Sequence, residues 1–272
     1  LEAIAVLGGP GSSAERTKAV VDLFAGLTTS EQDFLAALLL GGLRQGASDR
    51  LMLDAVAKAS AVPAGVVRRA AMFTGDVSSV AVAARDGREA VSAFGLQLFR
   101  PVLPMLAKTA QSVPEGIASL GEAAVERKLD GARIQVHLYD GEVRIYTRNL
   151  NDVTDRLPEV VAAVAEFPAG SLVLDGEAIA LHPDGRPRSF QVTMGRFGTE
   201  SDASSVELAP FFFDVLHADG QDCLDLAYRD RSAILDEVVP AEYRVPRLIT
   251  DDSETAAAFF EDTVAAGHEG VV

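Results

Sequence analysis

The residues best suited to chemistry lie close together in mid-chain, at Glu126, Lys128, Asp130 and Arg133. A lysine amine can attack an electrophilic centre, but only in its neutral form. A free lysine has a pKa near 10.4, so about one in a thousand is neutral at pH 7. Burial, a nearby cation such as Arg133 or a bound metal ion would raise that fraction. The motif therefore leaves two interpretations open: a nucleophilic Lys128 beside an arginine that can bind oxyanions, or a hairpin with exposed charges.

Further motifs follow Lys128 in order along the chain. They are Tyr146-Thr147-Arg148-Asn149, Leu174-Asp175-Gly176-Glu177, Phe211-Phe212-Phe213-Asp214 and Glu269-Gly270-Val271-Val272. An Asp-Gly pair alone indicates only a turn, and the chain has six of them. In order and spacing, however, the series resembles the motifs of the ATP-dependent DNA ligase family. The resemblance is closest to archaeal-like and eukaryotic-like members with an N-terminal helical DNA-binding domain, and it covers nearly the whole chain.

The resemblance implies a covalent mechanism with ATP as the donor of AMP. Lys128 would attack the α-phosphate of ATP, form a phosphoramidate to AMP and release pyrophosphate. AMP would then pass to the 5′-phosphate of a DNA nick, which the 3′-hydroxyl would seal. Glu126 would recognise the adenine edge, and Arg133 and Arg148 would contact ribose and phosphate, because guanidinium groups offer several fixed donors.

The remaining site residues are implied in the same way. Glu177 would hold the ribose or a metal ion, and Glu269 would bind the divalent cation. Because carboxylates repel ATP, Mg²⁺ or Mn²⁺ must lie between them and the phosphates. Phe213 would stack on the adenine, although strand alternation places Phe211 on the same face and leaves the choice between them open.

Charge is distributed unevenly along the chain. The net charge of -16 argues by itself against a nucleic-acid partner. Residues 43–70, however, contain five basic side chains against two acidic ones, whereas 200–237 contain ten carboxylates. A local basic face is therefore possible beside an ordinary acidic surface. The residues predicted to contact the phosphates of nicked double-stranded DNA, in a salt-sensitive and sequence-independent way, are Arg44, Arg50, Arg68 and Arg69.

Hydrophobic periodicity divides the chain in two. Residues 17–99 show helical spacing, with a capping-box pattern at Ser30 and Asp33 and further helices starting near Ser48 and Pro63. Prolines in 100–104 then mark a linker, beyond which the period changes to two. The predicted strands are 132–139 and 142–147 around an Asp-Gly turn, 172–174 and 178–181 around a second one, and 211–216; the predicted helices are 154–166, 227–238 and 253–266.

We therefore predict a multidomain chain, with an all-α DNA-binding domain at 1–99 and an α+β nucleotidyltransferase (adenylation) domain at 100–272. A hydrophobic content of 48% is enough for two cores. Compared with the family, the N-terminal domain looks trimmed, and a later lysine motif and a C-terminal OB-fold domain are absent. We expect nick sealing by this chain to be impaired for that reason.

The remaining expectations concern setting and alternatives. No apolar run reaches the length of a membrane span, and the single Cys223 allows neither an internal disulfide nor a zinc site. We expect a monomer in a bacterial or archaeal cytoplasm, associated with the nucleoid, that acts in DNA replication, repair or recombination. No nucleophile–histidine triad is evident. Two alternatives stay open: an RNA ligase or capping-type enzyme, and a non-catalytic DNA-binding module.

Overall fold

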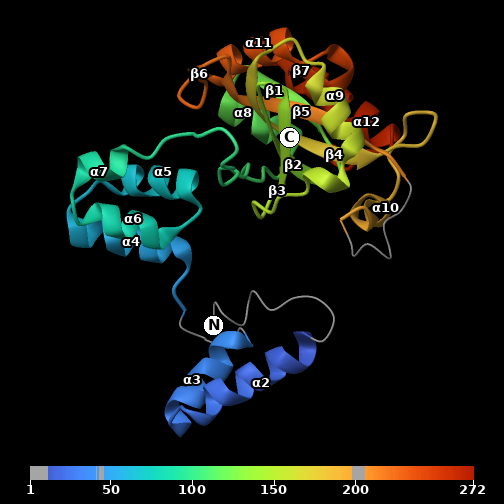
Figure 1. Cartoon of the computed structure of the whole chain (residues 1–272). Coiled ribbons are helices and arrows are strands. Elements are labelled where there is room, and N and C mark those ends of the chain that lie inside the picture. The colour runs from blue at the N-terminus through green and yellow to red at the C-terminus, as the bar shows by residue number, and fades with distance from the viewer. Residues whose placement is uncertain (1–11, 41, 43–45, 198–205) are drawn as a thin grey trace. The chain divides into compact units, whose positions relative to one another are not determined.

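The computed structural model describes residues 12–40, 42, 46–197 and 206–272 (Figure 1). The chain divides into two compact units, Leu1–Leu51 and Met52–Val272. No described helix is long and apolar enough to cross a membrane. The boundary at residues 99 and 100 that the sequence suggests stays a prediction.

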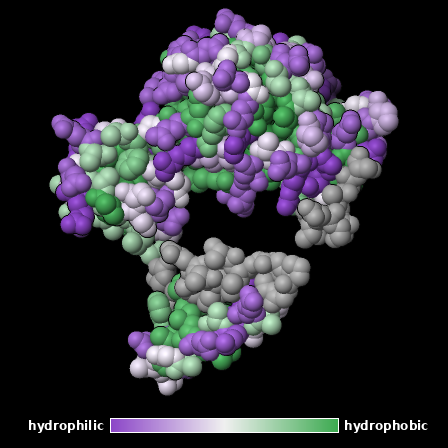
Figure 2. Space-filling view, viewed as in Figure 1, coloured by the Kyte–Doolittle hydropathy of each residue, from purple (hydrophilic) through white to green (hydrophobic). Residues whose placement is uncertain are grey.

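The described part of the first unit is helical, with α2 at Ser12–Ala25 and α3 at Thr29–Leu39. The predicted capping box at Ser30 and Asp33 is wrong, because Thr28 is the N-cap. Its hydroxyl accepts the N–H of Glu31 at 3.4 Å, and the Glu31 carboxylate accepts the N–H of Thr28 at 2.8 Å. No residue of α3 is buried, and Figure 2 shows hydrophobic side chains at the visible surface of this unit.

Four further helices come next: α4 (Asp49–Ser60), α5 (Ala64–Thr74), α6 (Val77–Ala84) and α7 (Arg88–Ser92). The predicted helix starts near Ser48 and Pro63 are confirmed. The second unit's helices share a core of small and β-branched side chains, among them Ala57, Val67 and Val80. Such side chains let short helices approach closely.

The main sheet of the second unit has five antiparallel strands in the order β3-β2-β4-β5-β6. The strands are β2 (Ala132–Tyr139), β3 (Glu142–Thr147), β4 (Ser171–Ala180), β5 (Leu208–Ala218) and β6 (Gln221–Asp222). The predicted hairpin is confirmed: Asp140 and Gly141 both have positive φ, 50° and 79°, as a two-residue turn between twisted strands requires.

One sequence prediction fails in this sheet. Residues 172–174 and 178–181 were expected to flank a turn at Asp175-Gly176-Glu177, yet β4 runs through these residues without a break. Gly176 is needed for a different reason, because a Cβ there would lie 2.6 Å from the carbonyl oxygen of Phe211. The glycine therefore allows β5 to approach β4 closely at a register shift, rather than turning the chain.

A smaller sheet carries the residues of the first motif. Its order is β7-β1-β8, with β7 at Arg247–Thr250, β1 at Ala123–Lys128 and β8 at Gly270–Val271. Helices α8 (Val113–Leu120) and α12 (Ser253–Ala265) pack against β1 through Ile117 and Ala256. Sequence periodicity did not predict β1, because only its apolar positions at Ala123 and Val125 alternate before charged residues follow.

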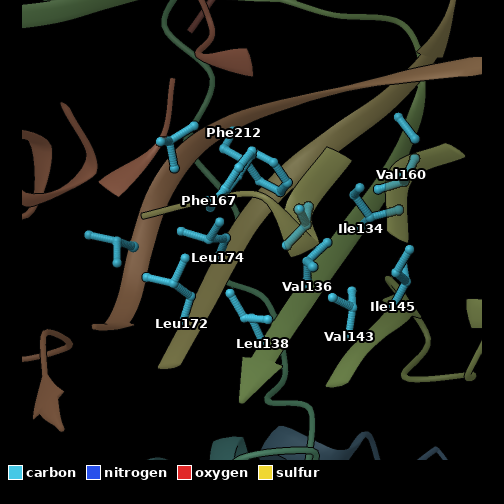
Figure 3. Packing of buried hydrophobic residues seen from close by; sticks show 14 of the residues in the cluster. Ile134, Val136, Leu138, Val143, Ile145, Val160, Phe167, Leu172, Leu174 and Phe212 are labelled. Carbon is cyan, nitrogen blue, oxygen red and sulfur yellow. The ribbon is translucent and has the colours of Figure 1, made fainter. Parts of the chain in front are cut away.

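The two faces of β2 differ. Ile134, Val136 and Leu138 face a core that is closed by α9 (Pro158–Ala165) and α11 (Tyr228–Val238), as Figure 3 shows for many of its side chains. The opposite face carries polar residues and is covered by the linker around residues 99–105. The predicted helix at 154–166 is instead a 3₁₀ turn, η1 (Thr154–Arg156), followed by α9. The remaining short helices are α10 (Phe190–Gly195) and η3 (Ala241–Tyr243).

Candidate nucleotide-binding site

A cleft of about 790 Å³ opens between β1, the polar face of β2, β4, β5 and the linker. Its lining contains every residue that the sequence predicts to bind ATP: Glu126, Lys128, Arg133, Arg148, Glu177 and Phe213. These side chains come from segments far apart in the sequence, and the pairing of the strands brings them together. A volume of this size suits a small-molecule ligand.

Lys128 and Glu269 meet because their strands pair. Lys128 is the last residue of β1 and is the register partner of Gly270 in β8, and the N–H of Glu269 donates to the carbonyl of Lys128 at 3.3 Å. The Lys128 Nζ forms an ion pair with the Glu269 carboxylate. Both side chains are about half exposed, 45% and 51%, so the amine is open to a ligand in the cleft.

The turn after Lys128 is tight for a steric reason. A Cβ on Gly131 would lie 2.5 Å from the carbonyl oxygen of Ala178, so only glycine lets this turn pass over β4. Arg133 emerges from the turn into the cleft. Asp130 precedes Gly131 in the same turn, is exposed and does not line the cleft.

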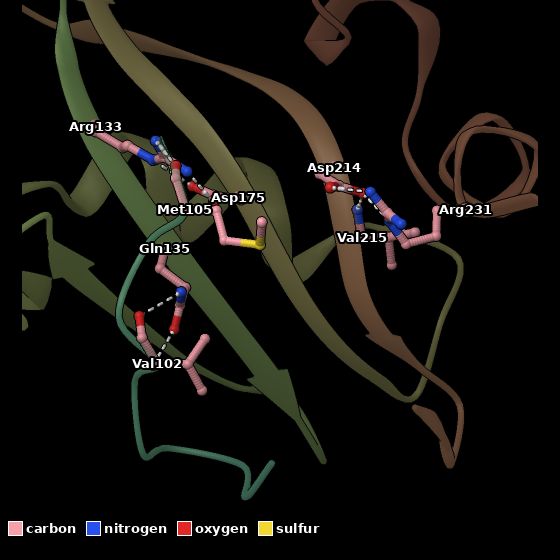
Figure 4. A network of polar contacts seen from close by, with 8 residues as sticks. All are labelled: Val102, Met105, Arg133, Gln135, Asp175, Asp214, Val215 and Arg231. Carbon is pink, nitrogen blue, oxygen red and sulfur yellow. Dashed lines mark hydrogen bonds and ion pairs between the residues drawn. The ribbon is translucent and has the colours of Figure 1, made fainter. Parts of the chain in front are cut away.

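Arg133 is held by several partners (Figure 4). Its Nε and Nη2 donate to the two carboxylate oxygens of Asp175 at 2.9 and 2.5 Å, and its Nη1 donates to the carbonyl of Met105 at 3.1 Å. The guanidinium carbon lies 5.3 Å from the centre of the Phe213 ring. Asp175 is buried at the middle of β4. The fork geometry therefore fixes Arg133 before any ligand arrives.

Burial disfavours the charged form of two carboxylates in the cleft, Glu177 and Glu126. Burial raises the pKa of Glu177 to about 7, and the neighbouring Asp175 adds to the effect, against Arg133, the N–H of Gly131 and Lys128, which lower it. Burial also raises the pKa of Glu126, although a hydrogen bond of 2.5 Å from the Tyr228 hydroxyl opposes the shift. A bound cation or cationic ligand edge would relieve both groups.

A β-bulge in β5 determines which of the three phenylalanines Phe211 to Phe213 faces the cleft. In the register of β4 and β5, Asp175 pairs with Asp214 and Gly176 with Phe212, so Phe213 is the extra residue. Phe212 is fully buried in the core, whereas Phe213 lines the cleft and Phe211 does not. The bulge thus turns one phenylalanine of three toward the cleft.

Among the described residues, no group of three or more His, Cys, Asp or Glu side chains could hold a metal ion. The two carboxylates predicted as metal ligands, Glu177 and Glu269, could bind a cation only together with another donor. Mg²⁺ commonly binds in this way, through one or two carboxylates and the phosphates of a substrate. Glu177 lines the cleft and fits such a cation, whereas Glu269 does not line it and is ion-paired with Lys128.

Comparison with known proteins shows which family the chain belongs to. Residues 104–272 match the family model described as "ATP dependent DNA ligase domain", and residues 1–57 match the one described as "DNA ligase N terminus". The chain belongs to the ATP-dependent DNA ligase family. The ligase relatives include "Probable DNA ligase" of Mycobacterium sp. (strain KMS), 53% identical over 271 residues, and "DNA ligase B" of Mycobacterium tuberculosis, 50% identical over 277 residues.

The chain spans about half the length of these curated ligases: 99% of the chain matches 52% of the first, and 100% matches 54% of the second. Among solved structures, the ligase domain of M. tuberculosis LigD is similar, with 30% identity over 62% of this chain and 52% of that one and a TM-score of 0.47. The ligase of bacteriophage T7 in complex with ATP gives 15% identity, 61% and 60% coverage and a TM-score of 0.36.

The four arginines predicted to bind DNA differ in their surroundings. Arg44 lies outside the described residues. Arg50 is exposed in α4. Arg68 and Arg69 are paired with carboxylates, Arg68 with Asp54 at 3.1 Å and Arg69 in bidentate fashion with Asp225 at 2.8 and 2.7 Å. DNA phosphates would have to displace these exposed partners, which hold only weakly in water.

A chain of polar contacts at the start of β4 has the form of a catalytic triad, which the sequence did not suggest. The Ser171 hydroxyl lies 3.2 Å from Nε2 of His217, whose Nδ1 lies 2.9 Å from Asp222. The N–H groups of Gly170 and Ser171 both donate to the Asp219 carboxylate, so they have no free donor to offer a ligand. Ser171 is also buried, so these contacts stabilise the end of the sheet.

Sequence reasoning missed the partners that hold the predicted site residues. Asp175 was visible only as part of an Asp-Gly pair, and its neighbour Glu177 received the functional role. Tyr228, which donates to Glu126, comes from α11, 102 residues away in sequence. The prolines of the linker indicated only a break between helices, although Val102 to Ala107 line the cleft. A pattern search could not have found contacts over such separations.

Proposed function

We propose that this chain carries the nucleotide-binding and DNA-binding parts of an ATP-dependent DNA ligase, with Lys128 as the covalent nucleophile. The observation that carries the proposal is the convergence in one cleft of an accessible lysine, two arginines, a half-buried glutamate and a phenylalanine ring, contributed by four strands and the segment after β3. Family membership supports ATP as the nucleotide.

The chemistry follows from these groups. The neutral Lys128 amine attacks the α-phosphorus of ATP, an N–P bond forms, the P–O bond to the β-phosphate breaks and pyrophosphate leaves while the nitrogen gives up a proton. The 5′-phosphate of a DNA nick then attacks the same phosphorus and releases the lysine. Finally, the 3′-hydroxyl attacks the activated 5′-phosphate, which seals the strand and releases AMP.

Each remaining residue binds or orients. Glu126 meets the adenine edge, Phe213 stacks on the base, and Arg133 and Arg148 contact ribose and phosphate. Glu177 and Glu269 would hold Mg²⁺ or Mn²⁺, which supplies positive charge to offset the phosphates when it is bound. Arg148 makes no hydrogen bond or ion pair with the described residues, so its guanidinium is available to a ligand.

The DNA-binding part is proposed to be an all-α domain that includes α2 to α7 and that grips nicked duplex DNA through Arg44, Arg50, Arg68 and Arg69. Because the contacts are to phosphates, binding should weaken steeply with salt and show no sequence preference. A monomer, a cytoplasmic location near the nucleoid, and roles in replication, repair or recombination complete the proposal. The bacterial origin of the relatives supports a bacterial setting.

Intact mass after incubation with a nucleotide and Mg²⁺ tests the covalent step. ATP should add one AMP to the wild type, and Lys128→Ala should stay unmodified. Lys58→Ala is the matched control, since it removes an exposed lysine in α4 and should still gain AMP. GTP in the same assay separates a capping-type enzyme, and labelling of Lys128→Ala at the wild-type level would contradict the proposal. A DNA-binding module without catalysis would bind nicks and never gain AMP.

A further inference from the structure

The linker after the helices is hydrogen-bonded residue by residue to the polar face of β2. Gln135 uses both ends of its amide: Oε1 accepts the N–H of Val102 at 2.8 Å, and Nε2 donates to the carbonyl of Val102 at 3.2 Å (Figure 4). The N–H of Phe99 donates to Nδ1 of His137 at 2.9 Å. These β2 side chains share one face because strand residues alternate.

The contacts of Gln135 and His137 are buried. Gln135 is 5% exposed, and His137 and Val102 are 0% and 2% exposed. Because Nδ1 of His137 accepts a hydrogen bond, Nε2 carries the proton and donates to Oε1 of Gln135 at 3.0 Å. If Gln135 is replaced, the buried N–H and carbonyl groups of Val102 lose their hydrogen-bond partners and cannot bond to water instead. Leaving buried polar groups unpaired destabilises the fold.

The same linker forms one wall of the cleft. Val102, Leu103 and Met105 line the cleft together with Gln135 itself, and Phe213 and Glu126 line it as well. Arg133 holds the next part of the wall through the carbonyl of Met105. Gln135 therefore holds the wall of the cleft at Val102.

We propose that Gln135 is a positioning residue for nucleotide binding, because it fixes the linker as a wall of the cleft without contacting the reacting atoms. The inference rests on the proposed function, since it assigns ATP to this cleft. It predicts that removing the hydrogen bonds between Gln135 and Val102 weakens ATP binding. The reaction at Lys128 should keep its normal rate once ATP is bound. Such a change raises KM and leaves kcat unaltered.

The test is Gln135→Met, which keeps the length of the side chain and removes both hydrogen bonds to Val102. The initial rate of AMP attachment, measured against ATP concentration, should show a KM raised about tenfold, which corresponds to about 1.4 kcal/mol of binding free energy, and a kcat within about twofold of the wild type. Ser171→Ala is the matched control. It removes another buried polar side chain of the same sheet, but outside the cleft, and should lower thermal stability without moving KM.

A second measurement needs no variant. Hydrogen exchange of the wild-type amides at Val102 and Leu103 should slow when ATP is added, because the ligand presses on the wall that contains them. An unchanged KM in a folded Gln135→Met, or a KM raised equally in Ser171→Ala, would overturn the inference. So would unchanged exchange of these amides while the wild type gains AMP. If the wild type gains no AMP, the proposed function is contradicted. Hydrogen exchange at Val102 and Leu103 would then still test whether ATP contacts this wall: slower exchange with ATP supports it, and unchanged exchange contradicts it.

Discussion

Replacing Glu177 with glutamine should stabilise the folded chain at alkaline pH and abolish its proposed activity. Burial lifts the pKa of Glu177 from its usual 4.5 to about 7, so the folded chain holds this proton more tightly than the unfolded chain does. Stability therefore falls as pH rises from about 4.5 to about 7. At 1.36 kcal/mol per pKa unit, the full penalty above pH 7 is about 3 kcal/mol.

Glu177→Gln removes the penalty and keeps an oxygen that can accept the N–H of Gly131. The difference in unfolding free energy between variant and wild type, from urea titrations, should be near zero at pH 4.5 and favour the variant by up to about 3 kcal/mol at pH 8. The difference cancels all other titrating groups. A constant difference across this range, or one that favours the wild type at pH 8, would refute the reasoning. AMP attachment should fall sharply in the same variant.

The remaining predictions concern the turn, the linker and the arginine fork. Gly131→Ala should destabilise the fold by about 1–3 kcal/mol in urea titrations, because its Cβ meets the carbonyl of Ala178 at 2.5 Å, whereas Gly65→Ala, with open space around it, should be neutral or slightly stabilising. Burial lowers the pKa of His137 to about 4, so the folded chain keeps this imidazole neutral and loses about 3 kcal/mol of unfolding free energy as pH falls from 6.5 to 4. The loss should be clearest in urea titrations of Glu177→Gln, because Glu177 changes the stability in the opposite direction over part of this pH range. Arg133→Lys should cost about 3 kcal/mol of stability and raise the KM for ATP, because an ammonium can replace only part of the fork that holds Asp175; equal KM values would contradict this.

Local patterns predicted the elements whose causes are local. The hairpin at Asp140 and Gly141 and the helix starts near Ser48 and Pro63 are confirmed, because turn chemistry and helix punctuation act within a few residues. The same reasoning failed at Gly176. There an Asp-Gly pair lies inside a strand, since the need for glycine comes from a neighbouring strand and not from a turn.

The candidate site was predictable as a set of residues but not as an arrangement. The motif order identified the residues that line the cleft, and their roles stay predictions. What fixes them lies far away in the sequence: Asp175 holds Arg133, Tyr228 holds Glu126, and a bulge selects Phe213. Pairings of this kind depend on sheet register, which a single sequence does not encode in any short window.

At Val102 and Leu103 the linker is bonded to two parts of the second unit. Gln135 of β2 grips Val102, and the N–H of the next residue, Leu103, donates to the carbonyl of Met72 in α5 at 2.9 Å. Any displacement of α5 that preserves this bond must carry Leu103 with it and so reshape the wall of the cleft. By thermodynamic reciprocity, a ligand that prefers one shape of the wall must favour one placement of α5 to the same extent. The placement of α5 and the shape of the cleft are thus coupled through Val102 and Leu103.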